Sequence, residues 1–236
     1  MKRGDVGPAD NSEKLSQVVK ISRQFLRSIR LDTDIGREDA LSGYVCQGTA
    51  RSLLESMARQ IRDTKQRAFT WTGPYGGGKS SLALMLCSLV GSNRHLRERA
   101  RAILDLPTGN PVETAFAARG EGWMVIPVVG KRASVTEALA KALNAAKGEA
   151  LALRRGKQKQ DLIADLVAAA DQHPQGVLLV IDELGKFLEA AAQEGDDVYF
   201  FQELAEAASR SSGKLVVVGI LHQSFDAYAA RLGRQA

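Results

Sequence analysis

A glycine-rich stretch constrains the fold of this chain most strongly: residues 70–86 read "TWTGPYGGGKSSLALML". Three consecutive glycines cost backbone entropy on folding, and a packed core does not require them. They lie between a short β-rich run and an apolar run with helical spacing, and the segment from Gly73 to Ser80 fits the pattern G-x-x-x-x-G-K-[ST]. In such a loop the backbone N–H groups surround phosphate oxygens at the positively polarised start of a helix.

The motif gives a role to its two polar side chains. We expect Lys79 to reach the β- and γ-phosphates of a nucleotide and the Ser80 hydroxyl to bind Mg²⁺. The alternative is a glycine-rich turn that only resembles this motif, and the strand before it and the helix after it disfavour that alternative. The predicted phosphate-binding residues are Gly73, Pro74, Tyr75, Gly76, Gly77, Gly78, Lys79, Ser80 and Ser81.

A second motif, "VLLVIDELGKF", ends an apolar strand in two acids. At the carboxyl end of a parallel strand, Asp182 lies where ligands bind in open α/β sheets. We expect Asp182 to hold Mg²⁺ through water and Glu183 to orient and polarise an attacking water molecule. Alternatively, both acids only favour the start of the following helix.

The order of the expected elements predicts an α/β fold. Because strands alternate with helices, the sheet should be parallel and covered on both faces. The 236 residues, 44% of them hydrophobic, suffice for one sizeable domain. We divide the chain into an N-terminal helical extension, residues 1–40, and a core, residues 41–236. Strands are expected at 67–72, 123–129, 177–182 and 214–221, and helices at 13–30, 49–63, 79–90, 134–153, 158–171, 184–192, 197–210 and 224–234, with broken helices over 92–119.

With its third motif, "KLVVVGILHQSF", the chain resembles the ASCE-class P-loop ATPases, which include AAA+ and STAND proteins. "GPYGGGKS" corresponds to their Walker A motif, "VLLVIDE" to Walker B and "LVVVGILHQ" to the sensor-1 strand. The resemblance implies a three-layer P-loop fold with strand order 5-1-4-3-2, and ATP and Mg²⁺ as cofactors. It also implies that Gln223 or His222 contacts the γ-phosphate or the water molecule. Since the usual asparagine is absent, either residue fits, and helix capping is the alternative.

The same resemblance suggests two further sites. Tyr44 and Val45 lie where AAA+ proteins carry the segment that packs on adenine, although ordinary core packing explains them equally well. Arg231 and Arg234 lie where AAA+ proteins carry an arginine finger, which acts on the ATP of a neighbouring subunit. This position implies a homo-oligomer or a larger complex, and the alternative is a solvated helix face.

The resemblance is incomplete at the C-terminal end. Four strands are expected before residue 236, and the fifth strand of the family is missing, which leaves the Walker A strand at an apolar edge. We therefore expect residues 1–236 to be the N-terminal part of a longer protein, active only weakly by themselves. The "GPYGGGKS" and "DELGK" segments are similar to those of large ATPases of BREX-type bacterial phage-defence systems.

Composition restricts the partners. The net charge of +5 permits an acidic partner, and the helically spaced arginines of "NRHLRERAR" and the basic "LRRGKQK" segment make nucleic acid possible. However, aromatic residues make up only 6% of the chain, and solvated faces explain these charges as well. The two cysteines indicate a reducing compartment, and the apolar runs are too short to span a bilayer, so we expect a cytoplasmic protein without a membrane partner.

These observations predict an ATP-hydrolysing module that drives conformational change in a larger, oligomeric assembly, with a role in anti-phage defence. The alternative is a slow nucleotide-dependent switch with little turnover. A small-molecule kinase of the other P-loop branch is disfavoured, because such enzymes lack the extra strand between the Walker strands and seldom carry an acid at the position of Glu183.

Overall fold

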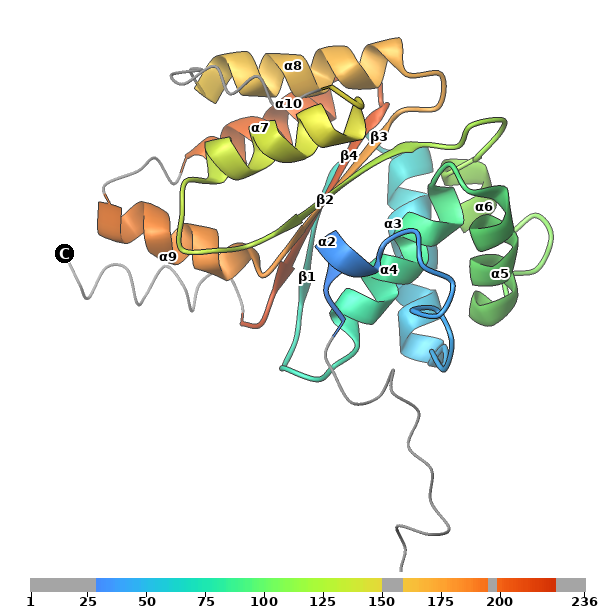
Figure 1. Ribbon diagram of the computed structural model, residues 1–236. Helices are drawn as coiled ribbons and strands as arrows, with labels where there is room; N and C mark the ends of the chain where they lie inside the picture. The colour runs from blue at the N-terminus through green and yellow to red at the C-terminus, as the bar shows by residue number, and fades with distance from the viewer. Residues whose placement is uncertain (1–28, 150–158, 195–198, 224–236) are drawn as a thin grey trace, which may run out of the picture.

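The computed structural model describes residues 29–149, 159–194 and 199–223. A parallel sheet lies at the centre of these residues, and helices pack on both of its faces (Figure 1). The predicted three-layer α/β fold is therefore confirmed. Most of the extension 1–40, with its expected helix 13–30, and the last expected helix lie outside the described residues.

The four predicted strands are all present and all parallel. Their order in the sheet is β1-β4-β3-β2, which is the expected 5-1-4-3-2 order without its fifth strand. Within the described residues β1 pairs only with β4, so its other edge carries no strand there. The strands are β1 (Ala68–Thr72), β2 (Met124–Val129), β3 (Val177–Asp182) and β4 (Leu215–Leu221).

The strands β3 and β4 are buried over their whole length, which explains their continuous apolar sequence. Successive side chains of a strand point to opposite faces. Leu178 and Val180 accordingly join the core on one face of the sheet, and Leu179 and Ile181 join the core on the other. A strand covered on both faces must be apolar at nearly every position, and Asp182 at the end of β3 is the exception. Each fully buried aliphatic side chain contributes roughly 1.5–3 kcal/mol.

One face of the sheet is covered by helices from the first half of the chain (Figure 1). The segment expected to contain broken helices, 92–119, forms two. The side chain of Asn93 caps the first and that of Asn110 caps the second, where it accepts from the Val112 N–H at 2.9 Å. The helices on this face are α2 (Leu31–Asp34), α3 (Gly48–Asp63), α4 (Lys79–Val90), α5 (Arg94–Leu104) and α6 (Pro111–Ala115).

The other face is covered by helices that follow β2. In α10 the buried residues are Phe200, Leu204 and Ala208, which recur every fourth position and form one apolar stripe. These helices are α7 (Val135–Ala146), α8 (Lys159–Gln172), α9 (Leu184–Glu194) and α10 (Phe200–Arg210).

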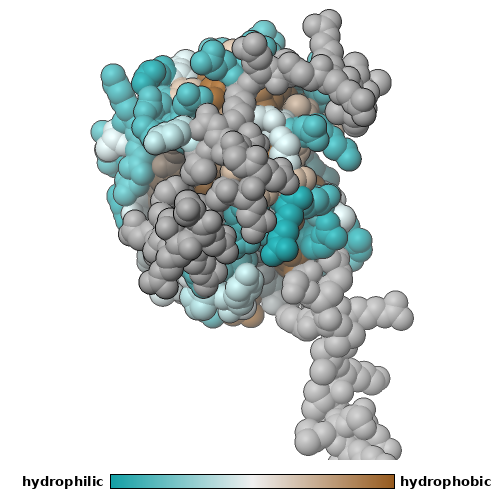
Figure 2. Space-filling model, turned by 90° about the vertical axis from the view of Figure 1, so that its left-hand side faces the viewer, coloured by the Kyte–Doolittle hydropathy of each residue, from teal (hydrophilic) through white to brown (hydrophobic). Residues whose placement is uncertain are grey.

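Figure 2 views the molecule from the α9 side, where the described surface is mainly hydrophilic. No described helix is both long and apolar enough to cross a bilayer.

Candidate nucleotide-binding site

The predicted phosphate-binding loop and the predicted acids meet at the carboxyl edge of the sheet. A cavity of about 560 Å³ lies between the glycine loop, the end of β3 and the end of β4. Lys79, Ser80, Asp182, Glu183 and His222 all line it. A larger cavity of about 900 Å³ lies near the start of β2, at the opposite edge of the sheet, and none of the predicted site residues lines that one.

Glycine backbone conformations shape the loop that follows β1. Gly76 and Gly78 have φ angles of 74° and 75°, in the left-handed region that residues with a Cβ rarely adopt. Gly78 immediately precedes the first residue of α4, so the loop delivers Lys79 and Ser80 to the start of that helix. The Lys79 Nζ donates to the carbonyls of Gly73 at 2.7 Å and Pro74 at 2.8 Å. The loop thus curls around the ammonium group of Lys79. Burial and the charge of Asp182 shift the pKa of this group in opposite directions.

Burial lowers the pKa of Lys79, and the neighbouring charge of Asp182 partly opposes this change. Asp182 itself is only 3% exposed. Burial raises the pKa of its carboxyl group, whereas the Ser80 side chain and the Glu183 N–H, which donates to Oδ1 at 2.8 Å, lower that pKa. The buried carboxylate therefore has a cation and two polar partners beside it, and its ionised form would be stabilised further by a second positive charge.

The donor set fits Mg²⁺. Ser80 and Asp182 offer a hydroxyl and a carboxylate, the hard oxygen ligands that this ion prefers, and both line the cavity. No cluster of three or more acidic, histidine or cysteine residues suited to a metal occurs in the described part of the chain. This is compatible with Mg²⁺, which commonly takes one or two protein ligands and completes its shell with phosphate oxygens and water.

Glu183 lies in a tight turn between β3 and α9. Its φ angle is 53°, an unusual conformation for a residue with a side chain and one that recurs at functional sites. The Gly130 N–H donates to the Asp182 carbonyl at 2.7 Å, and Gly130 packs so closely that a Cβ there would lie 2.1 Å from the Glu183 carbonyl oxygen. The Glu183 carboxylate is ion-paired with the Lys186 Nζ.

The two sensor candidates differ in their surroundings. His222 lines the cavity, and its ring stacks on that of Tyr75 from the glycine loop, with 3.6 Å between ring centroids and 19° between ring planes. Both ring nitrogens are buried, and neither has a hydrogen-bond partner among the described residues. Burial, followed by the Lys79 charge, lowers the pKa of His222, which favours a neutral imidazole near pH 7. Gln223 is half-exposed and is not among the residues that line the cavity.

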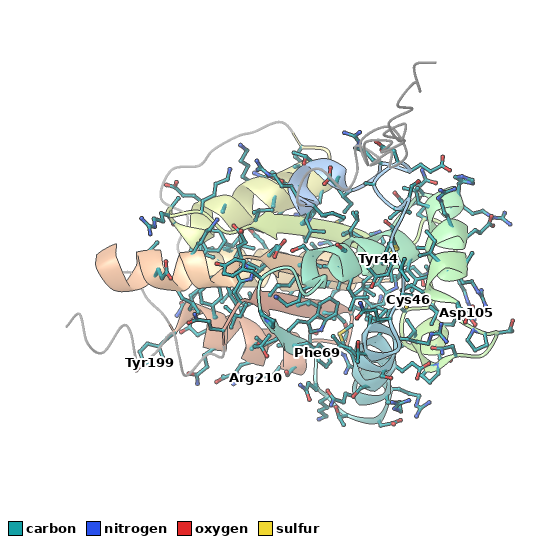
Figure 3. All side chains as sticks on the ribbon, turned by 90° about the horizontal axis from the view of Figure 1, so that it is seen from below. Tyr44, Cys46, Phe69, Asp105, Tyr199 and Arg210 are labelled. Carbon is teal, nitrogen blue, oxygen red and sulfur yellow. The ribbon has the colours of Figure 1, made fainter. Side chains whose placement is uncertain are left out.

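The two candidate adenine contacts lie away from the phosphate cavity. Neither Tyr44 nor Val45 lines it. Val45 is 79% exposed, whereas Tyr44 packs against the core, and burial raises its pKa to about 12. Figure 3 shows Tyr44 close to Cys46, on the side of the molecule that holds α3 to α6 and away from Tyr199. The adenine contact stays a prediction for both residues, and the candidate arginine fingers Arg231 and Arg234 lie outside the described residues.

The arginines of the first basic cluster are engaged within the chain. Arg94 pairs with Glu98, and Arg101 pairs with Glu113. Arg97 donates to the carbonyls of Gly91, Ser92 and Gly120. Most of the second cluster, "LRRGKQK", lies outside the described residues. A nucleic-acid contact through either cluster therefore stays a prediction.

The sequence model of the family described as "Novel STAND NTPase 1" matches residues 48–233. The match spans both Walker motifs and the sensor strand, which the fold brings to one cavity. The chain belongs to the novel STAND NTPase family. It therefore carries a nucleoside-triphosphatase module, as the resemblance to ASCE-class P-loop ATPases predicted.

A search of the curated proteins found no match to this novel STAND NTPase. Among solved structures it is similar to the Aeropyrum pernix ORC2 protein, with 16% identity, 80% of this chain and 45% of that one covered, and a TM-score of 0.48. C. elegans PCH-2 matches at 12% identity over 82% of this chain and 44% of its own, with a TM-score of 0.42. Cdc6p from Pyrobaculum aerophilum matches at 14% identity over 84% of this chain and 46% of its own, also with a TM-score of 0.42. The chain thus spans about half the length of these proteins.

The structure adds residues to the site of this STAND NTPase that sequence reasoning missed. Arg30, Lys131 and Lys186 also line the cavity, so its lining carries four cations, with Lys79, against two acids. Lys186 had a sequence signal, since it lies three residues after Glu183 at the start of a predicted helix. Arg30 and Lys131 had none, because each comes from a segment that only the fold brings to the cavity.

Proposed function

We propose that this chain binds ATP with Mg²⁺ in the cavity at the carboxyl edge of the sheet and hydrolyses the bond to the γ-phosphate. The observation that supports the proposal best is the convergence of the Lys79–Ser80, Asp182–Glu183 and His222 segments on one cavity. The volume of about 560 Å³ suits a nucleotide-sized ligand.

Each group has a distinct part in this proposal. The backbone N–H groups of the loop and the N-terminus of α4 bind the phosphates, and Lys79 exchanges the Gly73 and Pro74 carbonyls for phosphate oxygens. Ser80 and Asp182 would hold Mg²⁺, which neutralises phosphate charge when bound. Glu183 orients the attacking water and accepts its proton. His222, as a neutral imidazole in the cavity, hydrogen-bonds the γ-phosphate or the water.

A slow switch is the second candidate function, and one specific contact favours it. The Glu183 carboxylate is ion-paired with Lys186, and a carboxylate held in this way is less free to orient an attacking water molecule. If the pair persists with ATP bound, hydrolysis is slow and the ATP-bound form is long-lived. The rate of single-turnover hydrolysis separates the two candidates.

For the whole protein we propose a motor or switch part in a larger assembly. The family resemblance supports ATP-driven conformational change, and the arginine-finger candidates Arg231 and Arg234 support an oligomer in which one subunit completes the site of its neighbour. The similarity of "GPYGGGKS" and "DELGK" to BREX-type ATPases supports a cytoplasmic role in anti-phage defence. Phage plaque counts on cells that carry the wild-type or the Lys79→Ala protein test that role.

The binding and hydrolysis proposals are tested with two variants of the 236-residue chain. Lys79→Ala should lose ATP binding, because the cation that offsets phosphate charge is gone. Glu183→Gln should keep binding and lose turnover by about a hundredfold or more, because an amide cannot accept the proton. Calorimetry with ATP and a phosphate-release assay measure the two effects. Lys141→Ala, which removes an exposed cation of α7, is the matched control. ATP affinity that is equal in Lys79→Ala and the wild type would contradict the site.

A further inference from the structure

Lys186 stands out among the cations of the cavity because it contacts the acid proposed to activate water. It is the third residue of α9, and its backbone N–H donates to the Glu183 carbonyl at 3.0 Å. Its Nζ pairs with the Glu183 carboxylate, one helical turn back. Both side chains keep contact with the cavity, since Lys186 is 47% and Glu183 30% exposed.

Two of the other three cations of the cavity have different partners. Lys79 donates to carbonyls of the glycine loop, and Arg30 pairs with Asp32. Lys186 also lies near the sensor end of the site, because its charge acts on His222 together with those of Lys79, Asp182 and Glu183. Lys186 is thus a cation of the cavity that pairs with Glu183 and whose charge also acts on His222.

We propose that Lys186 binds the γ-phosphate of the nucleotide and that this contact releases the Glu183 carboxylate to act on water. The inference rests on the function proposed above. Lys186 has two possible partners, the carboxylate and the terminal phosphate, and the phosphate carries the larger negative charge. A bound triphosphate therefore competes successfully for the ammonium group, whereas a diphosphate leaves the ion pair intact. Lys186 makes the site distinguish ATP from ADP and couples that distinction to activation of Glu183.

The competition predicts a specific pattern of affinities. Losing a hydrogen bond between two charged groups costs about tenfold or more in affinity. Lys186→Met should therefore weaken binding of a non-hydrolysable ATP analogue by about tenfold or more and leave ADP affinity unchanged. Glu183→Gln should strengthen analogue binding, because Lys186 no longer has a competing carboxylate. The double variant should bind the analogue as Lys186→Met does, since without the ammonium group the carboxylate and the γ-phosphate no longer compete for a partner.

A thermodynamic cycle tests this pattern. The four proteins are titrated with Mg²⁺·ADP and with the Mg²⁺·ATP analogue by calorimetry, with Lys141→Met as a control for the loss of one exposed cation. If Glu183→Gln raises analogue affinity in the wild type but not in the Lys186→Met variant, the result supports the proposal. If it raises analogue affinity equally in both, the cause is loss of simple charge repulsion, and the proposal is refuted. An analogue-to-ADP affinity ratio that Lys186→Met leaves at the wild-type value also refutes it, while ATP binding and its dependence on Lys79 would still stand. If the wild-type chain binds neither nucleotide, both the proposed function and this inference fail.

Discussion

Replacing Gly130 by alanine should disturb the turn that carries Asp182 and Glu183. Gly130 follows β2, and its N–H donates to the Asp182 carbonyl at 2.7 Å. An added Cβ would lie 2.1 Å from the Glu183 carbonyl oxygen and 3.2 Å from that of Asp182. Both neighbouring atoms belong to the backbone, so no side chain can rotate away. The turn must therefore move by about 1 Å to reach an ordinary contact distance.

The cost of this shift follows from its components. Forcing an extra methyl group into a packed site costs roughly 1–3 kcal/mol, and weakening the Gly130 hydrogen bond costs roughly 1 kcal/mol. Alanine restricts the unfolded chain and returns roughly 0.4–1 kcal/mol. The free energy of unfolding should therefore fall by roughly 1–4 kcal/mol, which lowers Tm by about 2–14 °C in a chain of this size. The displaced Glu183 should also cost at least about tenfold in ATP hydrolysis.

Thermal and denaturant unfolding measure the first effect, and phosphate release measures the second. Gly48→Ala is the matched control, because a Cβ at Gly48 meets nothing within 4 Å and the residue lies at the start of α3. That variant should be as stable as the wild type or slightly more stable. A Gly130→Ala variant with wild-type stability and hydrolysis would show that the turn moves without a free-energy cost, and the expected steric clash would be contradicted.

Three further outcomes follow from the site and the core. Asp182→Asn should unfold at the same or a higher temperature than the wild type at pH 7 without nucleotide, and should gain no stability from Mg²⁺·ATP. Burial raises the pKa of Asp182, so its ionised form destabilises the fold at pH values above its ordinary pKa, and the advantage of asparagine should shrink as the pH falls toward 3. Tyr75→Ala should raise the pKa of His222, measured by NMR titration, because the unstacked imidazole is better hydrated; an unchanged pKa would mean that the stack does not shield the ring. Burial raises the pKa of Cys87 to about 12, so at pH 8 a thiol reagent should modify Cys46 first and Cys87 only on unfolding, as mass spectrometry would detect; equal rates would contradict the buried position.

Much of the fold could be predicted from the sequence, because its signals are local. A strand buried on both faces must be almost entirely apolar, and "VLLVI" and "LVVVGIL" are. A phosphate loop requires glycines with left-handed backbone angles, and Gly76 and Gly78 have them. The strand order came from resemblance to a family, since no local pattern specifies which strands pair.

The remaining features of the site depend on contacts between distant segments. Gly130 supports the Glu183 turn because β2 lies beside β3, and Tyr75 stacks on His222 because β1 lies beside β4. The sequence left His222 and Gln223 as equal sensor candidates, and in the folded structure His222 lines the cavity whereas Gln223 does not. Such contacts are set by the packing of the whole sheet, and hydrophobic periodicity carries no information about them.

The sequence by itself therefore determined the chemistry of the site: a glycine loop with Lys79 and Ser80, and a buried strand that ends in Asp182 and Glu183. The tertiary structure decided how these groups are held. It brought Arg30 and Lys131 to the same cavity, it buried Asp182 beside Lys79, and it paired Glu183 with Lys186. The physical reason is that residue types specify which interactions a group can make, whereas the electrostatic field at a carboxylate depends on every charge that folding places around it.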